Sequence, residues 1–267
     1  MQVKIDKLKY GPWAVVTGAS SGIGRECARL LGEQGFYLFL VSRNERELDA
    51  LAKELTEEHS IKVEVLPLDL MHHEANEELL NRTSDFEVGL LVAASGFGTS
   101  GPFIQSKLER EKEMLLVNCA AVLEQCYHFG KRFRERGSGG LILFGSIVGF
   151  QGTPFASNYA ATKAYIQSLA EGLRSEWKSN GVDVLSCAPG PTKTGFAAVA
   201  DMEMNGAMSP RIVAGETLSA LGRGTTVLPG FKTKFLTYSL AMLPRWLRVL
   251  VMKAVMSGMI KHQQIAR

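Results

Sequence analysis

Cysteine is scarce in this 267-residue sequence, and its spacing excludes two kinds of small-protein architecture. The four cysteines form no Cys-x-x-Cys pair and have no histidine cluster beside them: Cys27, Cys119, Cys126 and Cys187. Disulfide frameworks and zinc sites need such groupings, so we expect neither. The adjacent residues His72 and His73 point in different directions, so we predict no metal site there either. This cysteine usage is typical of the reduced cytoplasm.

Long hydrophobic runs are also missing. No stretch of about 18 uncharged apolar residues occurs, and residues 1–12 lack the apolar core of a secretory signal. We therefore expect a protein that is neither secreted nor membrane-spanning. The composition, with 46% apolar and 21% charged residues, excludes disorder, and 27 glycines without a fixed period exclude collagen. One globular domain with a large core is the simplest interpretation.

Carboxylate side chains are absent after Glu216. The last 51 residues carry eight cations, whereas the first 216 residues have 22 cations against 27 carboxylates. Those eight cations are Arg223, Lys232, Lys234, Arg245, Arg248, Lys253, Lys261 and Arg267. Such a charge asymmetry along the chain is typical of a protein that binds an anionic partner. Nucleic acid is not the partner we expect, because the cations alternate with apolar residues and no binding motif is present.

Short β-branched runs alternate with segments of helical periodicity from Trp13 onward. The expected strands are 13–17, 37–42, 62–66, 88–93, 141–144, 182–187 and 225–228, and the expected helices are 23–34, 45–58, 107–136, 159–179 and 210–221. The strands are continuously apolar, which indicates burial on both faces. This pattern predicts an α/β fold with a mostly parallel, seven-stranded sheet.

A glycine-rich loop joins the first expected strand to the first expected helix. Gly18 suits the tight turn, Gly22 permits close approach of a pyrophosphate, and Gly24 permits close helix packing. The free N–H groups of a helix N-terminus bind phosphate well. We predict that the pyrophosphate of a dinucleotide cofactor contacts this loop at Gly18, Ser20, Ser21, Gly22, Ile23 and Gly24. The alternative is a purely structural turn.

Residues at the ends of the second and third strands predict whether NAD or NADP binds. Ser42 and Arg43 end the second strand, where an acidic residue would bind the ribose of NAD and an arginine pairs with the 2′-phosphate of NADP. We predict NADP(H), with a solvated surface arginine as the alternative. Asp69, followed by Leu70, ends the third strand and can accept a hydrogen bond from the adenine amino group.

Tyr159 and Lys163 stand four residues apart, hence on one face of an expected helix. A nearby ammonium lowers the pKa of a phenol, which would make Tyr159 an acid or base near neutral pH. Tyr127 and Lys131 have the same spacing, so spacing alone is weak support. Only the first pair also has a serine, Ser146, 13 residues before the tyrosine and just after a strand.

These motifs, in this order, resemble those of the short-chain dehydrogenase/reductase family over residues 10–230. The matching positions are TGASSGIG at 17–24, Asp69, Asn118, Ser146, YAATK at 159–163, Pro189-Gly190 and Thr194. The resemblance implies a Rossmann-like, doubly wound domain that transfers a hydride between NAD(P) and a carbonyl or alcohol carbon. It also implies a homodimer or homotetramer.

The resemblance implies a role for each matching residue. Tyr159 would protonate the substrate oxygen, Lys163 would lower the pKa of Tyr159 and hold the nicotinamide ribose, and Ser146 would orient the substrate. Asn118 would anchor a water that passes protons toward Lys163. Further cofactor contacts would come from Gly96, Pro189, Gly190, Thr192 and Thr194. One departure is Ala93-Ala94-Ser95-Gly96 in place of the family's Asn-Asn-Ala-Gly, so the chain lacks the asparagine side chains whose hydrogen bonds steady the sheet at that point in the family.

Large apolar side chains are expected around the nicotinamide and predict an apolar substrate pocket with a mobile lid at 192–209. They are Phe97, Phe103, Phe150, Phe155, Phe196, Val199, Met202, Met204 and Met208. The alternative is that these side chains only pack against one another.

The chain divides into a catalytic domain at 1–230 and an apolar, basic appendage at 231–267. On a helical wheel the cations of the appendage scatter, so a simple surface helix describes it poorly. Three interpretations stay open: a cover for the substrate pocket or a subunit interface, a peripheral contact with an anionic membrane, or a dock for a phosphate-bearing carrier.

The sequence therefore predicts an NADPH-dependent carbonyl reductase or alcohol dehydrogenase acting on apolar ketones or secondary alcohols. A 3-oxoacyl-thioester or hydroxysteroid reductase is the alternative within enzymes. A non-catalytic NADP(H)-binding sensor or scaffold is the alternative outside them.

Overall fold

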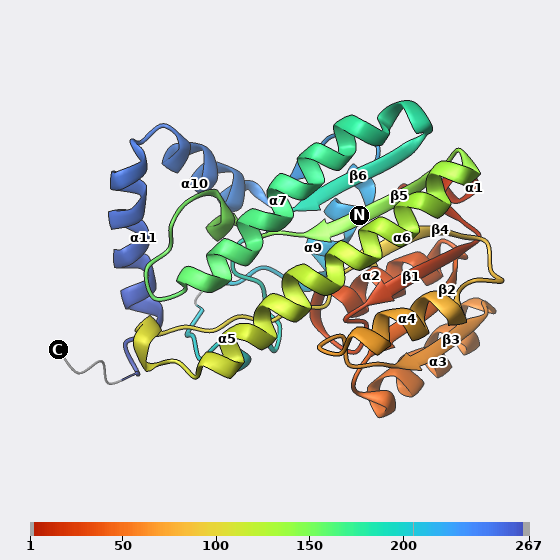
Figure 1. Cartoon of the computed structure of the whole chain (residues 1–267), viewed down its shortest axis with the longest axis horizontal. Coiled ribbons are helices and arrows are strands. Elements are labelled where there is room, and N and C mark those ends of the chain that lie inside the picture. The colour runs from red at the N-terminus through yellow and green to blue at the C-terminus, as the bar shows by residue number, and fades with distance from the viewer. Residues whose placement is uncertain (1–2, 205, 264–267) are drawn as a thin grey trace.

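The computed structural model describes residues 3–204 and 206–263 of the chain. Seven strands form one sheet in the order β3-β2-β1-β4-β5-β6-β7, and every neighbouring pair is parallel (Figure 1). The strands are β1 (Trp13–Thr17), β2 (Tyr37–Ser42), β3 (Val63–Pro67), β4 (Val88–Ala93), β5 (Gly139–Phe144), β6 (Val182–Cys187) and β7 (Thr226–Val227). The strand order reverses between β1 and β4, which confirms the doubly wound, Rossmann-like fold.

Helices cover both faces of the sheet. On one face lie α2 (Gly22–Glu33), α3 (Glu45–His59) and α9 (Pro210–Ala220), and on the other lie α4 (His73–Arg82), α6 (Ala121–Arg136) and α7 (Ser157–Trp177). Helix α5 (Leu108–Leu115) continues into α6 through a π-helical turn, Leu116–Ala120. Shorter helices are α1 (Lys7–Tyr10), α8 (Phe196–Val199) and the 3₁₀ turns Phe103–Gln105, Ile147–Phe150 and Lys178–Asn180.

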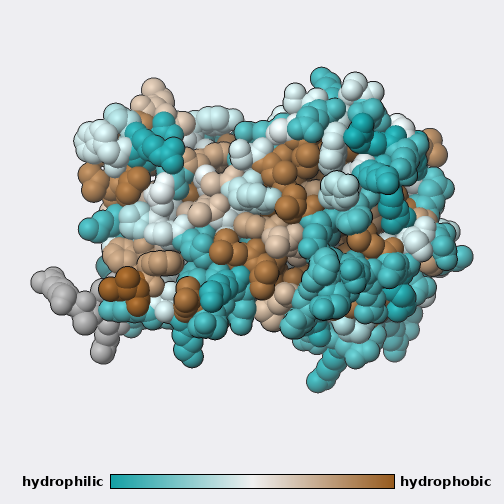
Figure 2. Space-filling view, viewed as in Figure 1, coloured by the Kyte–Doolittle hydropathy of each residue, from teal (hydrophilic) through white to brown (hydrophobic). Residues whose placement is uncertain are grey.

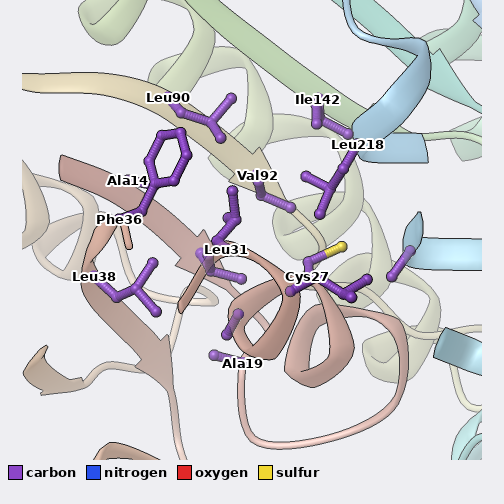
Figure 3. Close-up of a cluster of buried hydrophobic side chains, with 14 of the residues drawn as sticks. Ala14, Ala19, Cys27, Leu31, Phe36, Leu38, Leu90, Val92, Ile142 and Leu218 are labelled. Atoms are coloured by element: carbon purple, nitrogen blue, oxygen red, sulfur yellow. The ribbon is translucent and has the colours of Figure 1, made fainter. Parts of the chain in front are cut away.

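Two hydrophobic cores result from the alternation of side chains along each strand. Val16 and Leu40 lie in the core under α2 and α3, whereas their neighbours Val15 and Val41 lie in the core under α4, α6 and α7. Figure 3 shows the first core, where Leu31 of α2 lies beside side chains of the central strands. Both neighbours on a strand are buried, which explains why the strands are continuously apolar in sequence.

The expected elements are largely confirmed. β1, β2, β4 and β6 have the predicted bounds, while β5 begins earlier and β7 is only two residues long. Helix α4 was not predicted, because only Ala75, Asn76 and Leu79 are buried on it, too few for a clear apolar period.

The appendage folds as two helices, α10 (Phe231–Ala241) and α11 (Arg245–Met259). They form the left-hand end of the molecule in Figure 1, away from β1, β2 and β3. Met256 and Ile260 pack in a small apolar cluster with Ala200 and Met202. No helix within the described residues is long and apolar enough to cross a membrane. Arg267, counted above among the cations, lies outside the described residues.

Candidate active site

A cavity of about 540 Å³ opens where the central strands end. The loops that follow β1 to β6 all contribute to its wall, as is usual for ligand sites of doubly wound sheets. Every predicted site residue except Asn118 lines it. These residues are Gly18, Ser20, Ser21, Gly22, Ile23, Gly24, Ser42, Arg43, Asp69, Leu70, Gly96, Ser146, Tyr159, Lys163, Pro189, Gly190, Thr192 and Thr194. The structure therefore brings together residues that are up to 176 positions apart in the chain, from Gly18 to Thr194.

The glycine loop needs its glycines for two different reasons. Gly18 and Gly22 have φ angles of +68° and +57°, in the left-handed region that favours glycine. A Cβ on Gly24 would lie 2.4 Å from the carbonyl oxygen of Gly18, so α2 packs directly on the turn. No side chain caps the N-terminus of α2. Its first N–H groups can therefore bind an anion, and the loop fits a pyrophosphate.

At the far end of the cavity, Arg43 stands beside Asp69. Its Nη1 lies 3.8 Å from Oδ2 of Asp69, and its side chain is 63% exposed. So weak and exposed an ion pair leaves the guanidinium able to bind a further anion. The residues present thus fit the ribose end of a dinucleotide.

Tyr159 and Lys163 lie on the first turns of α7 and face the same cavity. Lys163 Nζ lies 5.7 Å from the centre of the Tyr159 ring and donates a hydrogen bond to the carbonyl oxygen of Phe144 at 2.8 Å. Ser146, two residues after β5, lies near the Tyr159 hydroxyl and lines the same cavity. Its Oγ donates a hydrogen bond to the Pro189 carbonyl oxygen at 3.5 Å and accepts one from the backbone N–H of Val148 at 3.4 Å. The matching pair on α6 is different, because Tyr127 is 68% exposed.

The pKa of Tyr159 differs from the expectation that the neighbouring Lys163 ammonium lowers it. Desolvation raises the pKa of Tyr159 well above its usual value, and the hydrogen bond with Ser146 lowers it only in part. Burial also lowers the pKa of Lys163 from 10.5 to about 8. Tyr159 in this cavity is therefore protonated at neutral pH. That form can donate a proton.

Asn118 does not line the cavity but supports its wall. The residue is buried on the π-helical turn between α5 and α6. Its Oδ1 accepts a hydrogen bond from the backbone N–H of Phe97, and its Nδ2 donates to the Phe97 carbonyl oxygen and to Thr162 Oγ1. The amide therefore fixes the loop after β4 against α7, a positioning role that the sequence did not suggest.

After β4 the chain lacks the family's two asparagines, and a threonine of β1 provides a hydrogen bond to this loop instead. The backbone N–H of Ser95 donates to Thr17 Oγ1 at 3.1 Å and links the ends of the two strands. Asn118 Oδ1 would lie 2.9 Å from a Cβ on Gly96, so that glycine is needed for close packing. The loop is held without the missing asparagines.

An apolar chamber adjoins Tyr159, and the sequence predicted it only partly. Of the expected aromatic and aliphatic residues, five line the cavity: Phe97, Phe196, Val199, Met202 and Met204. The other four do not, which corrects the prediction. Phe103 is 57% exposed, Phe150 lines a separate cavity, Phe155 packs in the apolar cluster near Met256, and Met208 packs on the α2-side core.

Six residues of the appendage complete the chamber wall and were missed individually. They are Leu236 of α10 and Val251, Met252, Val255, Met256 and Met259 of α11. The heptad-like spacing of Met252, Met256 and Met259 was a usable signal, because it places three methionines on one helix face. Gly98 was also missed. A Cβ there would meet the Phe196 ring at 2.6 Å and Tyr159 at 3.1 Å.

The chain is similar in sequence to a known family and to individual known proteins. The family model described as short chain dehydrogenase matches residues 12–205. The 7beta-hydroxysteroid dehydrogenase of Clostridium sardiniense is 34% identical over 186 residues, which are 70% of this chain and 71% of that protein. The very-long-chain 3-oxoacyl-CoA reductase of Pyricularia oryzae is 36% identical over 181 residues, 66% of this chain but only 55% of that enzyme.

Solved structures give the same result. The structure of a short-chain dehydrogenase from Sphingobium yanoikuyae in complex with NADPH has 28% sequence identity and a TM-score of 0.79. The superposition covers 86% of this chain and 93% of that one.

Proposed function

Because the chain belongs to the short-chain dehydrogenase/reductase family, we propose that it reduces bulky apolar ketones with NADPH and oxidises the corresponding secondary alcohols with NADP⁺. One observation carries this proposal. Tyr159 lines one continuous cavity whose wall includes the glycine loop and Arg43 as well as the methionine and aromatic side chains of the chamber.

The chain's own residues supply position and a proton, and the nicotinamide, when bound, supplies the hydride. In this proposal Ser146 donates a hydrogen bond to the substrate carbonyl oxygen and holds it beside the Tyr159 hydroxyl. Tyr159 then gives its proton to that oxygen as negative charge develops on it. The Lys163 ammonium stabilises the phenolate that remains. The N-terminus of α2 and Arg43 hold the phosphates.

Two observations support an apolar substrate. Tyr159 packs in a cluster of apolar side chains that includes Phe196 and Met202, and flexible methionines adapt to ligands of varied shape. The relatives that match most of the catalytic region carry names of dehydrogenases and reductases for hydroxysteroids and very-long-chain acyl thioesters. A steroid or 3-oxoacyl-thioester ketone is therefore the second candidate substrate class.

The test is NADPH oxidation by the purified protein with aryl ketones, alkyl ketones, steroid ketones, 3-oxoacyl thioesters and small charged keto acids. We expect turnover with the apolar ketones and little with the keto acids. Preference for the keto acids would overturn the assignment of the chamber. A protein that binds NADPH tightly but turns over none of these ketones would overturn the reductase assignment.

Arg43 predicts cofactor preference. The substitution Arg43→Ala removes the charge proposed to pair with the 2′-phosphate. We expect KM for NADPH to rise about 10-fold to 100-fold, the effect of losing a hydrogen bond to a charged group, with KM for NADH nearly unchanged. Arg46→Ala, an exposed arginine that does not line the cavity, is the matched control. Equal loss for both cofactors would contradict the assignment.

We further propose a cytoplasmic homodimer or homotetramer. Exposed apolar side chains on one stretch of α5, the π-helical turn and α6 support a contact between copies: Leu108, Leu115, Leu116, Leu123 and Tyr127. Carboxylates and lysines lie among them, including Glu113 and Lys131, so two copies can pair opposite charges there.

A further inference from the structure

The outer side of α10 carries an apolar stripe that no part of the chain covers within the described residues. Phe231, Phe235, Tyr238 and Met242 follow one another at intervals of four, three and four residues, so they share one helix face. They are 81%, 65%, 65% and 87% exposed. The opposite face packs on the protein through the buried residues Thr233 and Leu240.

Helix α11 also carries exposed apolar side chains, and exposed cations occur on both helices. Trp246, at the start of α11, is 65% exposed, and Leu250 follows one turn later at 53%. Lys232 and Lys234 are exposed on either flank of the α10 stripe, and Arg245 and Lys253 are exposed on α11. We call Phe231, Phe235, Tyr238, Met242, Trp246 and Leu250 the outer stripe. In Figure 2 the part of the surface formed by α10 and α11, at the left, shows brown and pale patches between teal ones.

We propose that the outer stripe docks the protein on the surface of an anionic lipid bilayer. Aromatic and aliphatic side chains on one helix face, flanked by lysines, enter the boundary between head groups and acyl chains. Tyrosine and tryptophan favour that boundary because they combine an apolar ring with a polar group. The cations would bind the lipid phosphates.

Charge distinguishes a bilayer from a second copy of the chain. In a two-fold contact each patch faces its own copy. The outer stripe would then face four lysines and arginines of the other copy, and α10 and α11 themselves carry no carboxylate side chain. Two carboxylates approach these helices: Glu216 accepts a hydrogen bond from the backbone N–H of Gly230, and Glu171 lines a small cavity with Tyr238 and Arg248. Cations therefore still outnumber carboxylates beside the stripe. The α5–α6 surface has charges of both signs and does not meet this obstacle. An anionic bilayer complements the outer stripe in both apolar character and charge.

The same two helices separate the apolar chamber from this surface. Leu236 on α10 and Val255 and Met256 on α11 line the chamber, while the outer stripe points away from it. Docking would therefore bring the chamber next to the hydrocarbon layer in which apolar ketones dissolve. This last step rests on the proposed function, whereas docking itself does not.

The test is flotation of the full-length protein with two kinds of vesicle. We expect binding to phosphatidylcholine vesicles containing about 30% phosphatidylglycerol, and much weaker binding to pure phosphatidylcholine or in about 0.5 M NaCl. The triple variant Phe231→Ser/Phe235→Ser/Met242→Ser should lower the partition coefficient at least about tenfold. The matched control, Leu8→Ser/Ile104→Ser, removes two side chains that are each 93% exposed elsewhere and should bind like the wild type.

Two outcomes would overturn the proposal: absence of vesicle binding by the wild type, and vesicle binding that the triple variant retains. If the wild type does not bind and the triple variant also changes oligomeric mass, the stripe belongs to a contact between copies. Turnover of a small water-soluble ketone, measured without vesicles, should be the same in the triple variant and the wild type. If neither the wild type nor the triple variant turned over the ketone, the result would contradict the proposed function. It would leave the proposed docking on the bilayer unaffected.

Discussion

Replacing Tyr159 by phenylalanine is expected to lower kcat for ketone reduction by about 100-fold to 10,000-fold, the usual contribution of a positioned general acid. The substitution removes one oxygen and leaves the ring, which packs 5.2 Å from the Phe196 ring between centroids. The fold and the cofactor groove therefore stay intact. Fluorescence titration should give nearly the wild-type Kd for NADPH, while steady-state kinetics records the loss of turnover.

The chain contains its own control for this experiment. Tyr127 and Lys131 repeat the spacing of Tyr159 and Lys163, but Tyr127 is exposed on α6 and lines no cavity. Tyr127→Phe should leave kcat unchanged. If Tyr159→Phe kept full activity, the proton would have to come from another group. If the wild type bound NADPH but reduced nothing, the sensor hypothesis would be favoured, because a sensor needs no proton donor.

Most of the fold could be predicted because its signals are local. The apolar runs of β1, β2, β4 and β6 are short, buried on both faces and bounded by turn residues, so their limits agree with the structure to the residue. Helix α4 shows where this approach fails. It lies beside α6 on one face of the sheet and buries a polar residue, Asn76, which bonds to Glu124 and Gln125. Tertiary contacts, and not an apolar period, specify that helix.

The residues of the candidate site that lie in loops directly after the strands could be predicted from the sequence. Loops after parallel strands meet at one edge, so Gly18, Arg43 and Ser146 come together as the sequence indicated. The chamber wall was less predictable, because which apolar side chains face the ligand depends on how α10 and α11 return to the domain. Phe150 and Phe155 are near Ser146 and Tyr159 in sequence, yet they pack elsewhere.

The direction of the pKa shifts was the least predictable property. The sequence placed an ammonium near a phenol and hence predicted a lower pKa for Tyr159. Burial affects both groups at once and is the largest cause of the pKa shift of each. Lys163 is only 7% exposed, and its ammonium donates a hydrogen bond to the Phe144 carbonyl oxygen. Spacing along a helix gives proximity, but it does not give the degree of desolvation.

Because Lys163 is desolvated, we expect Lys163→Met to raise the free energy of unfolding and to lower turnover. Lowering the pKa of Lys163 from 10.5 to about 8 corresponds to about 3 kcal/mol by which folding disfavours the charged form. Methionine has a similar shape without the charge, although it loses the hydrogen bond to Phe144, about 1 kcal/mol. We therefore expect a net gain of about 2 kcal/mol in the free energy of unfolding at pH 7. Turnover should fall by about 100-fold or more, as the phenolate loses its partner.

The pH dependence of that gain identifies its cause. Below pH 8 the lysine is charged in both the folded and the unfolded wild type, so the full penalty for burying the charge applies. Between pH 8 and 10.5 the folded state releases the proton first, and the wild type becomes more stable relative to the variant. The advantage of Lys163→Met should thus shrink as the pH rises through this range, as urea unfolding of both proteins at pH values on each side can show. Lys131→Met, at an exposed position, should give no such trend. A variant less stable than the wild type at pH 7, or a gain independent of pH, would mean that the buried ammonium is stabilised by its surroundings and that desolvation does not control the site.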